Sequence, residues 1–550
     1  MGWGNGLSKL LGRATLKHLK IIKQKTRSVL AAYAQTALFI VAIWSAAPGA
    51  AQIPASAGAG LPQLGDGSAM SSREERRLGD RIARTLYRDP DYLDDPVLSD
   101  YVQSVWQPLL AAARLRGDLT PELDEGFAWK LLLGRDRSVN AFALPGGYLG
   151  VHLGLLSVVG SRDELASVLG HELSHVTQRH ISRLMSKSSQ QAPWVVGAMI
   201  LGALAASKSN IDAGNALIVG GQALSAQSQL NFSRDMEREA DRVGLGVMTQ
   251  AGFNPQGFVG MFDKLQQASR LNDNGAYPYL RSHPLTTERV ADMQARLPLG
   301  GAATESAPDW LHAMMTARAR VLANAGPDAL RAWAGAFDAR APLMQQVSAL
   351  YASAMAASRL RDAALARTRL QQLQVLLAAQ APMPQQMEQQ LTILEVEIAL
   401  LARDLPRLAM LQLAQQMGLE RKAGQGTLAR AELLLQAQLV TQVNLESPLN
   451  AAAQNLLTWV SLNPADALAW QWLASIHAAQ GQTLRALRAE AEAQVAVLDY
   501  EAALDRLMAA QDRLQQSAGQ SSADHIDASI IDTRRRQIEQ LLKDQSNAKN

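Results

Sequence analysis

The sequence predicts an α+β fold that is mostly helical, in which a domain with one small sheet precedes an all-helical region. Strand-like patterns occur only between Phe127 and His152, whereas elsewhere apolar residues recur at helical spacing. Ala, Leu and Gln dominate the second half of the chain, and these residues lose little freedom in a helix. The 550 residues are enough for three or four structural units.

The first 51 residues have the order of a secretory signal. Seven basic residues and no acidic residue come first, and the mostly apolar Val29–Ala47 follows. Gly49-Ala50-Ala51 then offers the small residues that a signal peptidase needs. We expect cleavage before Gln52, with residues 52–70 forming a flexible leader. The alternative is an uncleaved anchor, since about 18 apolar residues can span a bilayer.

The composition excludes several classes of protein. The chain has no cysteine, so a disulfide framework, a Cys-based zinc or redox site and lipid attachment through cysteine are excluded. The formal charge of +3 becomes −4 when the seven basic residues of the first 51 are removed. A mildly acidic mature protein is not an obvious nucleic-acid binder, and we expect no nucleic acid among its partners.

Residues 71–300 are predicted to form the first domain. Ser72 and Glu75 have the spacing of a capping box that begins a helix, and Ser161 and Ser233 are predicted to cap two further helices. Three segments have patterns typical of strands: Phe127–Leu133, Asn140–Leu144 and Tyr148–His152.

Two segments interrupt the pattern of this domain. The apolar run Trp194–Ala206 is too short to cross a membrane comfortably, so we expect a buried helix there. A mobile flap or a surface for an apolar partner is the alternative. The Gly- and Ala-rich link Gly300–Pro308 marks the expected domain boundary.

Residues 309–515 are predicted to form a tetratricopeptide-like helical repeat domain. The spacing of a repeat of about 34 residues is matched by Pro464, Trp470, Leu473, Ala486 and Ala493. His477 stands where Tyr is usual, so the match is partial and an irregular helical bundle is the alternative. Residues 516–550 are a polar tail that we expect to be mobile, apart from one helix around Arg534–Leu542.

His171-Glu172-Leu173-Ser174-His175 is an H-E-x-x-H sequence on a predicted helix. Residues four apart lie one above the other on a helix, so His171 and His175 can hold one zinc ion. Glu172 then lies beside the attacking water as the general base. The pentapeptide also occurs by chance, so a structural pair of histidines is the alternative.

A second motif, Glu237-Arg238-Glu239-Ala240-Asp241, follows on its own predicted helix. Glu237 and Asp241 are one turn apart on one face. Glu237 can complete a His₂Glu site, and Asp241 can hydrogen-bond a ligand imidazole. Glu239 points away and is predicted to be a solvated charge. The predicted cofactor is one Zn²⁺ per chain.

With both motifs present, the chain resembles the zinc metallopeptidases related to the CAAX prenyl protease and HtpX. It is most similar to their soluble bacterial branch, the beta-barrel assembly-enhancing proteases. The resemblance is strong over residues 70–300 and extends over 310–515 in architecture only. The matching segments are Asn140–Gly147, His171–His175, Glu237–Asp241 and Ser282-His283-Pro284. It implies a gluzincin-type domain in which Glu237, not Glu239, is a zinc ligand.

The resemblance also implies a function, a zinc endopeptidase of the bacterial periplasm that degrades misfolded or stalled outer-membrane proteins. The expected partners are unfolded or misassembled envelope proteins and, through the repeat domain, the outer-membrane assembly machinery; peripheral membrane association is allowed. An extended substrate is expected to add as a strand beside Asn140, Ala141, Phe142, Ala143 and Leu144. The alternative is a chaperone or scaffold with occasional proteolysis, because repeat arrays offer extended binding surfaces.

Three roles are open for His283, which precedes Pro284. It is a polar residue before a turn, a group that stabilises the oxyanion, or an inhibitory fourth zinc ligand. His152 and His180 are predicted to be bystanders.

Overall fold

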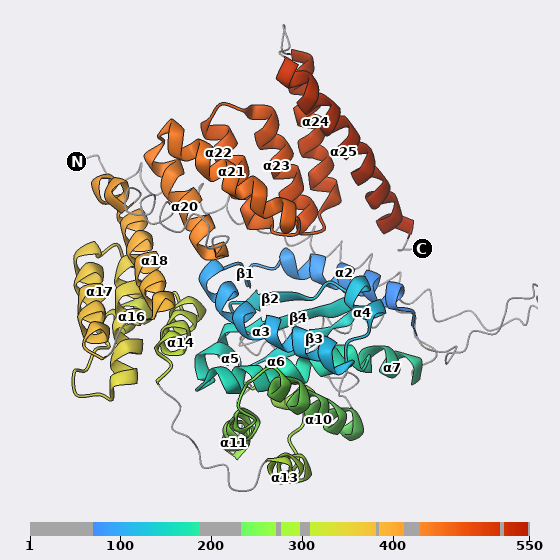
Figure 1. The fold of residues 1–550 in the computed structure, drawn as a ribbon, viewed down its shortest axis with the longest axis vertical. Coiled ribbons are helices and arrows are strands. Elements are labelled where there is room, and N and C mark those ends of the chain that lie inside the picture. The colour runs from blue at the N-terminus through green and yellow to red at the C-terminus, as the bar shows by residue number, and fades with distance from the viewer. Residues whose placement is uncertain are drawn as a thin grey trace, which may run out of the picture. The chain divides into compact units, whose positions relative to one another are not determined.

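The computed structural model describes residues 70–187, 233–270, 277–297, 308–380, 384–411, 429–516 and 522–547. Helices predominate, and one four-stranded sheet lies in the first part of the chain (Figure 1). The predicted fold class is therefore confirmed. The predicted signal peptide, nearly all of the leader, the run Trp194–Ala206 and nearly all of the link Gly300–Pro308 lie outside the described residues.

The sheet has the strand order β1-β2-β4-β3, with β2 and β4 parallel and the other two pairs antiparallel. Its strands are β1 Tyr92–Leu93, β2 Lys130–Gly134, β3 Ala141–Leu144 and β4 Tyr148–His152. Strand β2 begins three residues later than predicted, because Trp129 has a positive φ of 47° that interrupts the extended backbone. Gly146 and Gly147, with φ of 72° and 83°, turn the chain between β3 and β4.

The first part of the described chain also contains helices. They are α2 Ser72–Tyr87, α3 Pro96–Arg116, α4 Pro121–Gly126, α5 Leu153–Val158, α6 Arg162–Thr177, α7 His180–Lys187, α10 Arg234–Gln250, α11 Gln256–Arg270, α12 Tyr279–Ser282 and α13 Thr287–Arg296. Helices α3, α5 and α6 pack against strands of the sheet. Helix α6 packs against β3 on one side and against α3, α10 and α11 on others. Helix α6 is therefore the central helix of this part of the molecule.

Local capping explains where these helices begin. Ser161 and Ser233 accept hydrogen bonds from the backbone of α6 and α10, as predicted. The box at α2 is displaced by one residue from the prediction, because Ser71 caps the helix and Glu74 returns a bond to its backbone. The sequence contains two overlapping Ser-x-x-Glu patterns, one starting at Ser71 and one at Ser72. The helix uses the first, so Ser72 lies inside the helix.

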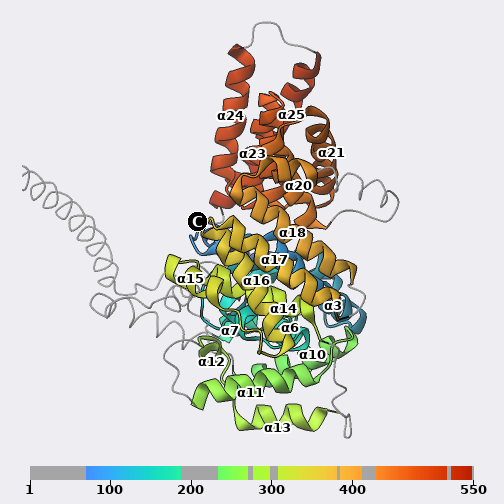
Figure 2. The same ribbon diagram turned by 90° about the vertical axis from the view of Figure 1, so that its left-hand side faces the viewer.

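The second half of the described chain contains helices only. They are α14 Trp310–Ala323, α15 Pro327–Gly335, α16 Leu343–Arg359, α17 Ala363–Ala378, α18 Gln385–Ala402, α20 Arg430–Val443, α21 Glu446–Leu462, α22 Ala467–Ala479, α23 Thr483–Ala496, α24 Tyr500–Gln516 and α25 Ser522–Asn547. Helices α21 to α25 pack against one another in sequence order (Figure 1), and Figure 2 gives the side view of this part, with α24 and α25 at its end. The repeat residues Leu473 on α22 and Ala486 and Ala493 on α23 are buried, and the tetratricopeptide-like assignment stays a prediction.

The end of the chain differs from the prediction of a mobile tail with one short helix. Helix α25 spans Ser522–Asn547 and packs on α24. Ile531 and Ile538, seven residues apart, are fully buried in this contact, and Arg534 pairs with Glu492 at 2.7 Å. Two isoleucines at heptad spacing are a weak signal in a polar sequence, and they suffice here because α24 offers a matching apolar face.

One apolar core joins the sheet-containing part to the helices that follow it. It runs from Val97 on α3 through α5, α6, α14, α16 and α18 to Leu439 on α20. A second cluster occupies α20 to α23, and a third occupies α23 to α25. Among the described helices, none has both the length and the apolar character that a membrane span requires.

Candidate metal centre

The two predicted motifs meet where helices α6 and α10 cross. Gly170 and Gly244 face each other at this crossing, and a Cβ on Gly244 would lie 3.0 Å from the carbonyl carbon of Gly170. Only glycine permits so close an approach of the two backbones. The crossing places Glu237 beside His171 and His175, although 62 residues separate Glu237 from His175 in the sequence.

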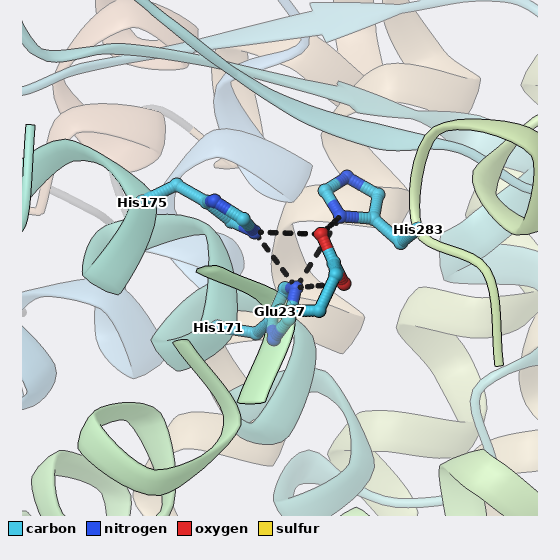
Figure 3. A group of neighbouring side chains, drawn as sticks. All are labelled: His171, His175, Glu237 and His283. Carbon is cyan, nitrogen blue, oxygen red and sulfur yellow. Dashed lines mark hydrogen bonds and ion pairs between the residues drawn. The ribbon is translucent and has the colours of Figure 1, made fainter. Parts of the chain in front are cut away.

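Four side chains form a buried group that could hold a metal ion: His171, His175, Glu237 and His283 (Figure 3). One potential ligand atom of each lies within 4.8 Å of the others. Nε2 of His171 is 3.0 Å from Nε2 of His175, and each Nε2 is 3.5 Å from a Glu237 carboxylate oxygen. The structure thus brings together all three predicted ligands, with the imidazole of His283 as a fourth member.

His283 enters the group from the short helix α12, of which it is the C-terminal cap. Its Nδ1 lies 3.0 Å from Glu237 Oε1 and 3.3 Å from His171 Nε2. Its Nε2 lies 3.4 Å from Glu172 Oε1. This position is within ligand distance of the group, so His283 is more than a polar residue before a proline.

Asp241 lies behind His171, as expected from its place one turn after Glu237. Its Oδ1 is 3.0 Å from His171 Nδ1. Burial disfavours a charged His171, but the carboxylates of Asp241 and Glu237 outweigh this effect and raise its pKa to about 9. Burial alone would raise the pKa of Glu237, but the neighbouring imidazoles of His283 and His171 hold it well below its usual value. Burial, followed by the neighbouring His171, lowers the pKa of His175 instead, so the acids of the site favour positive charge on His171 and not on His175.

Arg289 on α13 is a member of the site that the sequence analysis missed. Its guanidinium donates two hydrogen bonds of 2.7 Å to Asp241 and lies 2.8 Å from Glu237 Oε2. A third hydrogen bond, to the carbonyl of Pro284, ties it to the segment that carries His283. No sequence motif around Arg289 indicates its role, although two buried acids on α10 require a cation nearby.

His180 and Glu239 also differ from their predicted roles. His180 is fully buried, and its Nδ1 lies 2.9 Å from Nδ1 of His175. Glu239 accepts from His180 Nε2 at 3.1 Å and from Arg183 at 2.8 Å, so it is paired rather than solvated. The helix-face argument placed Glu239 correctly away from Glu237 but could not show that α7 covers that face. His152 contacts Ser138 at 2.9 Å and is not part of the metal group.

The donor set and its surroundings fit a zinc ion. Two imidazole nitrogens and one carboxylate are the ligands that catalytic zinc sites use. Both carboxylate oxygens of Glu172 are buried and lack a hydrogen-bond partner among the described residues. A buried carboxylate without a partner is costly, and a nearby cation with its water would reduce that cost.

Residues 100–297 match peptidase family M48. This segment contains both motifs of the buried group and is similar to the M48 metallopeptidases. The chain is 36% identical over 245 residues to a Vibrio cholerae protein assigned provisionally to the beta-barrel assembly-enhancing proteases, covering 43% of this chain and 47% of that protein. It is 34% identical over 240 residues to the beta-barrel assembly-enhancing protease of Escherichia coli K12, again covering 43% and 47%.

A more distant match extends to eukaryotes. The mitochondrial metalloendopeptidase OMA1 of Saccharomyces cerevisiae is 27% identical over 206 residues, which cover 36% of this chain and 56% of that protein. The chain spans about half the length of the curated relatives it matches. The resemblance and the enzyme class predicted from the sequence, a metalloprotease, are confirmed for this domain.

The predicted substrate strand lies beside this site. Strand β3 is at the edge of the sheet and pairs only with β4 among the described strands. It begins at Ala141, one residue later than predicted, and Asn140 contributes its carbonyl to a hydrogen bond from His152. Helix α6 packs against β3, so the edge of the sheet and the H-E-x-x-H helix are neighbours.

Proposed function

We propose that this chain is a zinc-dependent endopeptidase that cleaves unfolded or misassembled envelope proteins in the bacterial periplasm. The observation that carries the chemistry is the buried group of His171, His175 and Glu237 beside Glu172, whose buried carboxylate accepts no hydrogen bond from a described residue. The names of the bacterial relatives, which refer to beta-barrel assembly, support the envelope setting.

Each residue of the site has a separate role in peptide hydrolysis. His171, His175 and Glu237 hold the ion, which when bound supplies positive charge that polarises the scissile carbonyl and acidifies water. Glu172 takes the proton of the attacking water and returns it to the leaving amine. The carboxylate of Asp241, 3.0 Å from Nδ1 of His171, favours a proton on that nitrogen, which leaves Nε2 free to act as a ligand.

The edge strand β3 provides the binding surface in this proposal. An extended substrate that pairs with Ala141–Leu144 is recognised mainly through its backbone. Folded proteins do not present a free extended segment, so they are spared. This reading explains how one protease can act on many unfolded sequences.

His283 supplies the regulation in this proposal. As a fourth ligand, its imidazole would take the place that water needs and keep the enzyme inactive until it is displaced. Helices α21 to α25 form a stacked array suited to binding a partner such as the outer-membrane assembly machinery. Binding of a partner to this array would then be the event that displaces His283 and activates the enzyme.

The deciding experiment uses purified protein, zinc and an unfolded outer-membrane protein as substrate. The parent should produce fragments slowly, at the rate at which His283 leaves the water's place without a partner, and Glu172→Gln should bind zinc equally well and produce none. The same substrate in its folded form should persist with both proteins. Equal cleavage by the parent and Glu172→Gln would overturn the proposal.

The second candidate function, a chaperone or scaffold, is favoured by the size of the helical array relative to the catalytic part. It is tested with Glu172→Gln, which separates the two activities. If that variant prevents aggregation of the unfolded substrate as well as the parent does, binding by the array is an activity of its own. If the substrate aggregates equally with and without the variant, the scaffold function is excluded.

A further inference from the structure

The back of the ligand His175 is covered by a chain of three polar side chains that comes from two helices. His180 and Arg183 lie on α7, and Glu239 lies on α10. His180 Nδ1 is 2.9 Å from His175 Nδ1, its Nε2 is 3.1 Å from Glu239 Oε2, and Arg183 is 2.8 Å from the same oxygen. His175 and His180 are both fully buried.

The geometry permits one consistent arrangement of protons once Nε2 of His175 is a metal ligand. That nitrogen must offer its lone pair, so the proton of His175 is on Nδ1. Nδ1 of His180 then accepts this proton, and the proton of His180 is on Nε2, which donates to Glu239. Both hydrogen bonds are donated in the same direction, from the ligand His175 to His180 and from His180 to the carboxylate of Glu239.

The two ligand imidazoles are thus supported in matching ways. Asp241 reaches His171 directly, at 3.0 Å from its Nδ1. Glu239 reaches His175 through the intervening ring of His180. Both carboxylates project from α10, the helix that also carries Glu237, so one helix supplies a ligand and the support for both others.

We propose that His180 and Glu239 form a relay that orients His175 and increases its electron donation to the metal. They are positioning residues, because neither lies among the four potential ligands. Arg183 fixes Glu239 from the outer side and is the least buried of the three. The relay rests on the proposed zinc site and predicts that metal affinity depends on a carboxylate two side chains away.

The test is the zinc dissociation constant of the metal-free full chain, measured by competition with a chelating dye at pH 7.5. Outer partners of a metal-bound histidine typically change affinity by about 10- to 100-fold. We expect Glu239→Gln to weaken binding by about 10-fold, and His180→Asn by about 10- to 100-fold. Asp235→Asn is the matched control, since it removes a charge from the same helix at an exposed position and should change nothing.

A double variant distinguishes a relay from two independent packing effects. If Glu239 acts through His180, the variant with both changes should bind zinc no more weakly than His180→Asn alone. Additive losses would overturn the relay. Should His180→Asn fail to fold, as judged by circular dichroism, the visible spectrum of the Co²⁺-loaded Glu239→Gln protein decides, because it reports the ligand field and not activity.

The outcomes separate this inference from the proposed function. A parent that binds no zinc overturns the metal site itself. A parent that binds zinc, with a Glu239→Gln variant of equal affinity and an unchanged Co²⁺ spectrum, overturns the relay and leaves the site intact.

Discussion

Among the buried charged residues near the site, Arg289 should be the one whose replacement destabilises the protein most. The variant that tests this is Arg289→Met. Arg289 is buried and neutralises two buried acids, Asp241 and Glu237, at 2.7 and 2.8 Å. Removing one partner of a buried ion pair leaves an uncompensated charge and typically costs about 3–5 kcal/mol. We therefore expect the free energy of unfolding of the metal-free Arg289→Met variant to fall by about that amount.

Urea unfolding followed by circular dichroism, with a chelator present, measures this loss. Arg296→Met on the same helix is the control, because Arg296 is exposed and its pair with Asp292 should contribute less than about 1 kcal/mol.

The pH dependence of the loss provides a further check. Burial would raise the pKa of Asp241, but Arg289 and His171 together lower it. The carboxylate therefore contributes stability above its usual pKa and loses it as the pH falls through its lowered pKa, so the difference between parent and Arg289→Met should shrink only below about pH 4. Added zinc should restore part of the variant's stability, since the cation compensates Glu237. An Arg289→Met protein that unfolds at the parent's urea concentration at pH 7.5 would refute this reasoning.

Three further predictions concern single residues. Glu237→Ala should bind far less than one zinc per chain by elemental analysis, and full occupancy would assign the ligand to Glu239 or another group. His283→Ala should cleave an unfolded substrate faster than the parent with zinc content unchanged; a fall of about 100-fold would instead identify an oxyanion group. Burial raises the pKa of Asp100 to about 6, so its ionisation destabilises the fold as the pH rises from about 4 through 6. Asp100→Asn should gain up to about 3 kcal/mol at pH 7.5 and flatten the stability profile between those values, and an unchanged profile in thermal melts would contradict the assignment.

The sequence predicted the parts of the site that depend on local geometry. His171, Glu172 and His175 share one helix, and Glu237 and Asp241 share another, so the helical repeat of 3.6 residues is enough to place each set. Nothing local shows how the two helices meet, and that depends on the close approach of Gly170 and Gly244. A glycine inside a helix is a weak signal because it has many other causes.

The missed residues are those whose roles arise only from tertiary contacts. Arg289 lies 48 residues from Asp241, and His180 lies 59 residues from Glu239. His180 is five residues after His175, and the sequence does not show that it approaches this ligand. Helix α6 ends at Thr177 and a new helix begins at His180, which places the His180 ring against His175.

The shared core sets a limit on how this protein can be divided. A fragment ending at Leu297 would keep every residue of the metal site, yet it would lose Arg318, which is buried on α14 and pairs with Asp95 at 2.8 Å. It would also lose His312, whose ring contacts Tyr101 and the carbonyl of Val159. The smallest segment that could be inherited as a folded unit is therefore longer than the segment that carries the metal site. Recombination near residue 300 would separate the metal site from the helices that complete its apolar core. Two further apolar clusters hold α20 to α25 together, and α20 also belongs to the shared core. The helices after α20 are therefore the part that evolution could exchange for another specificity.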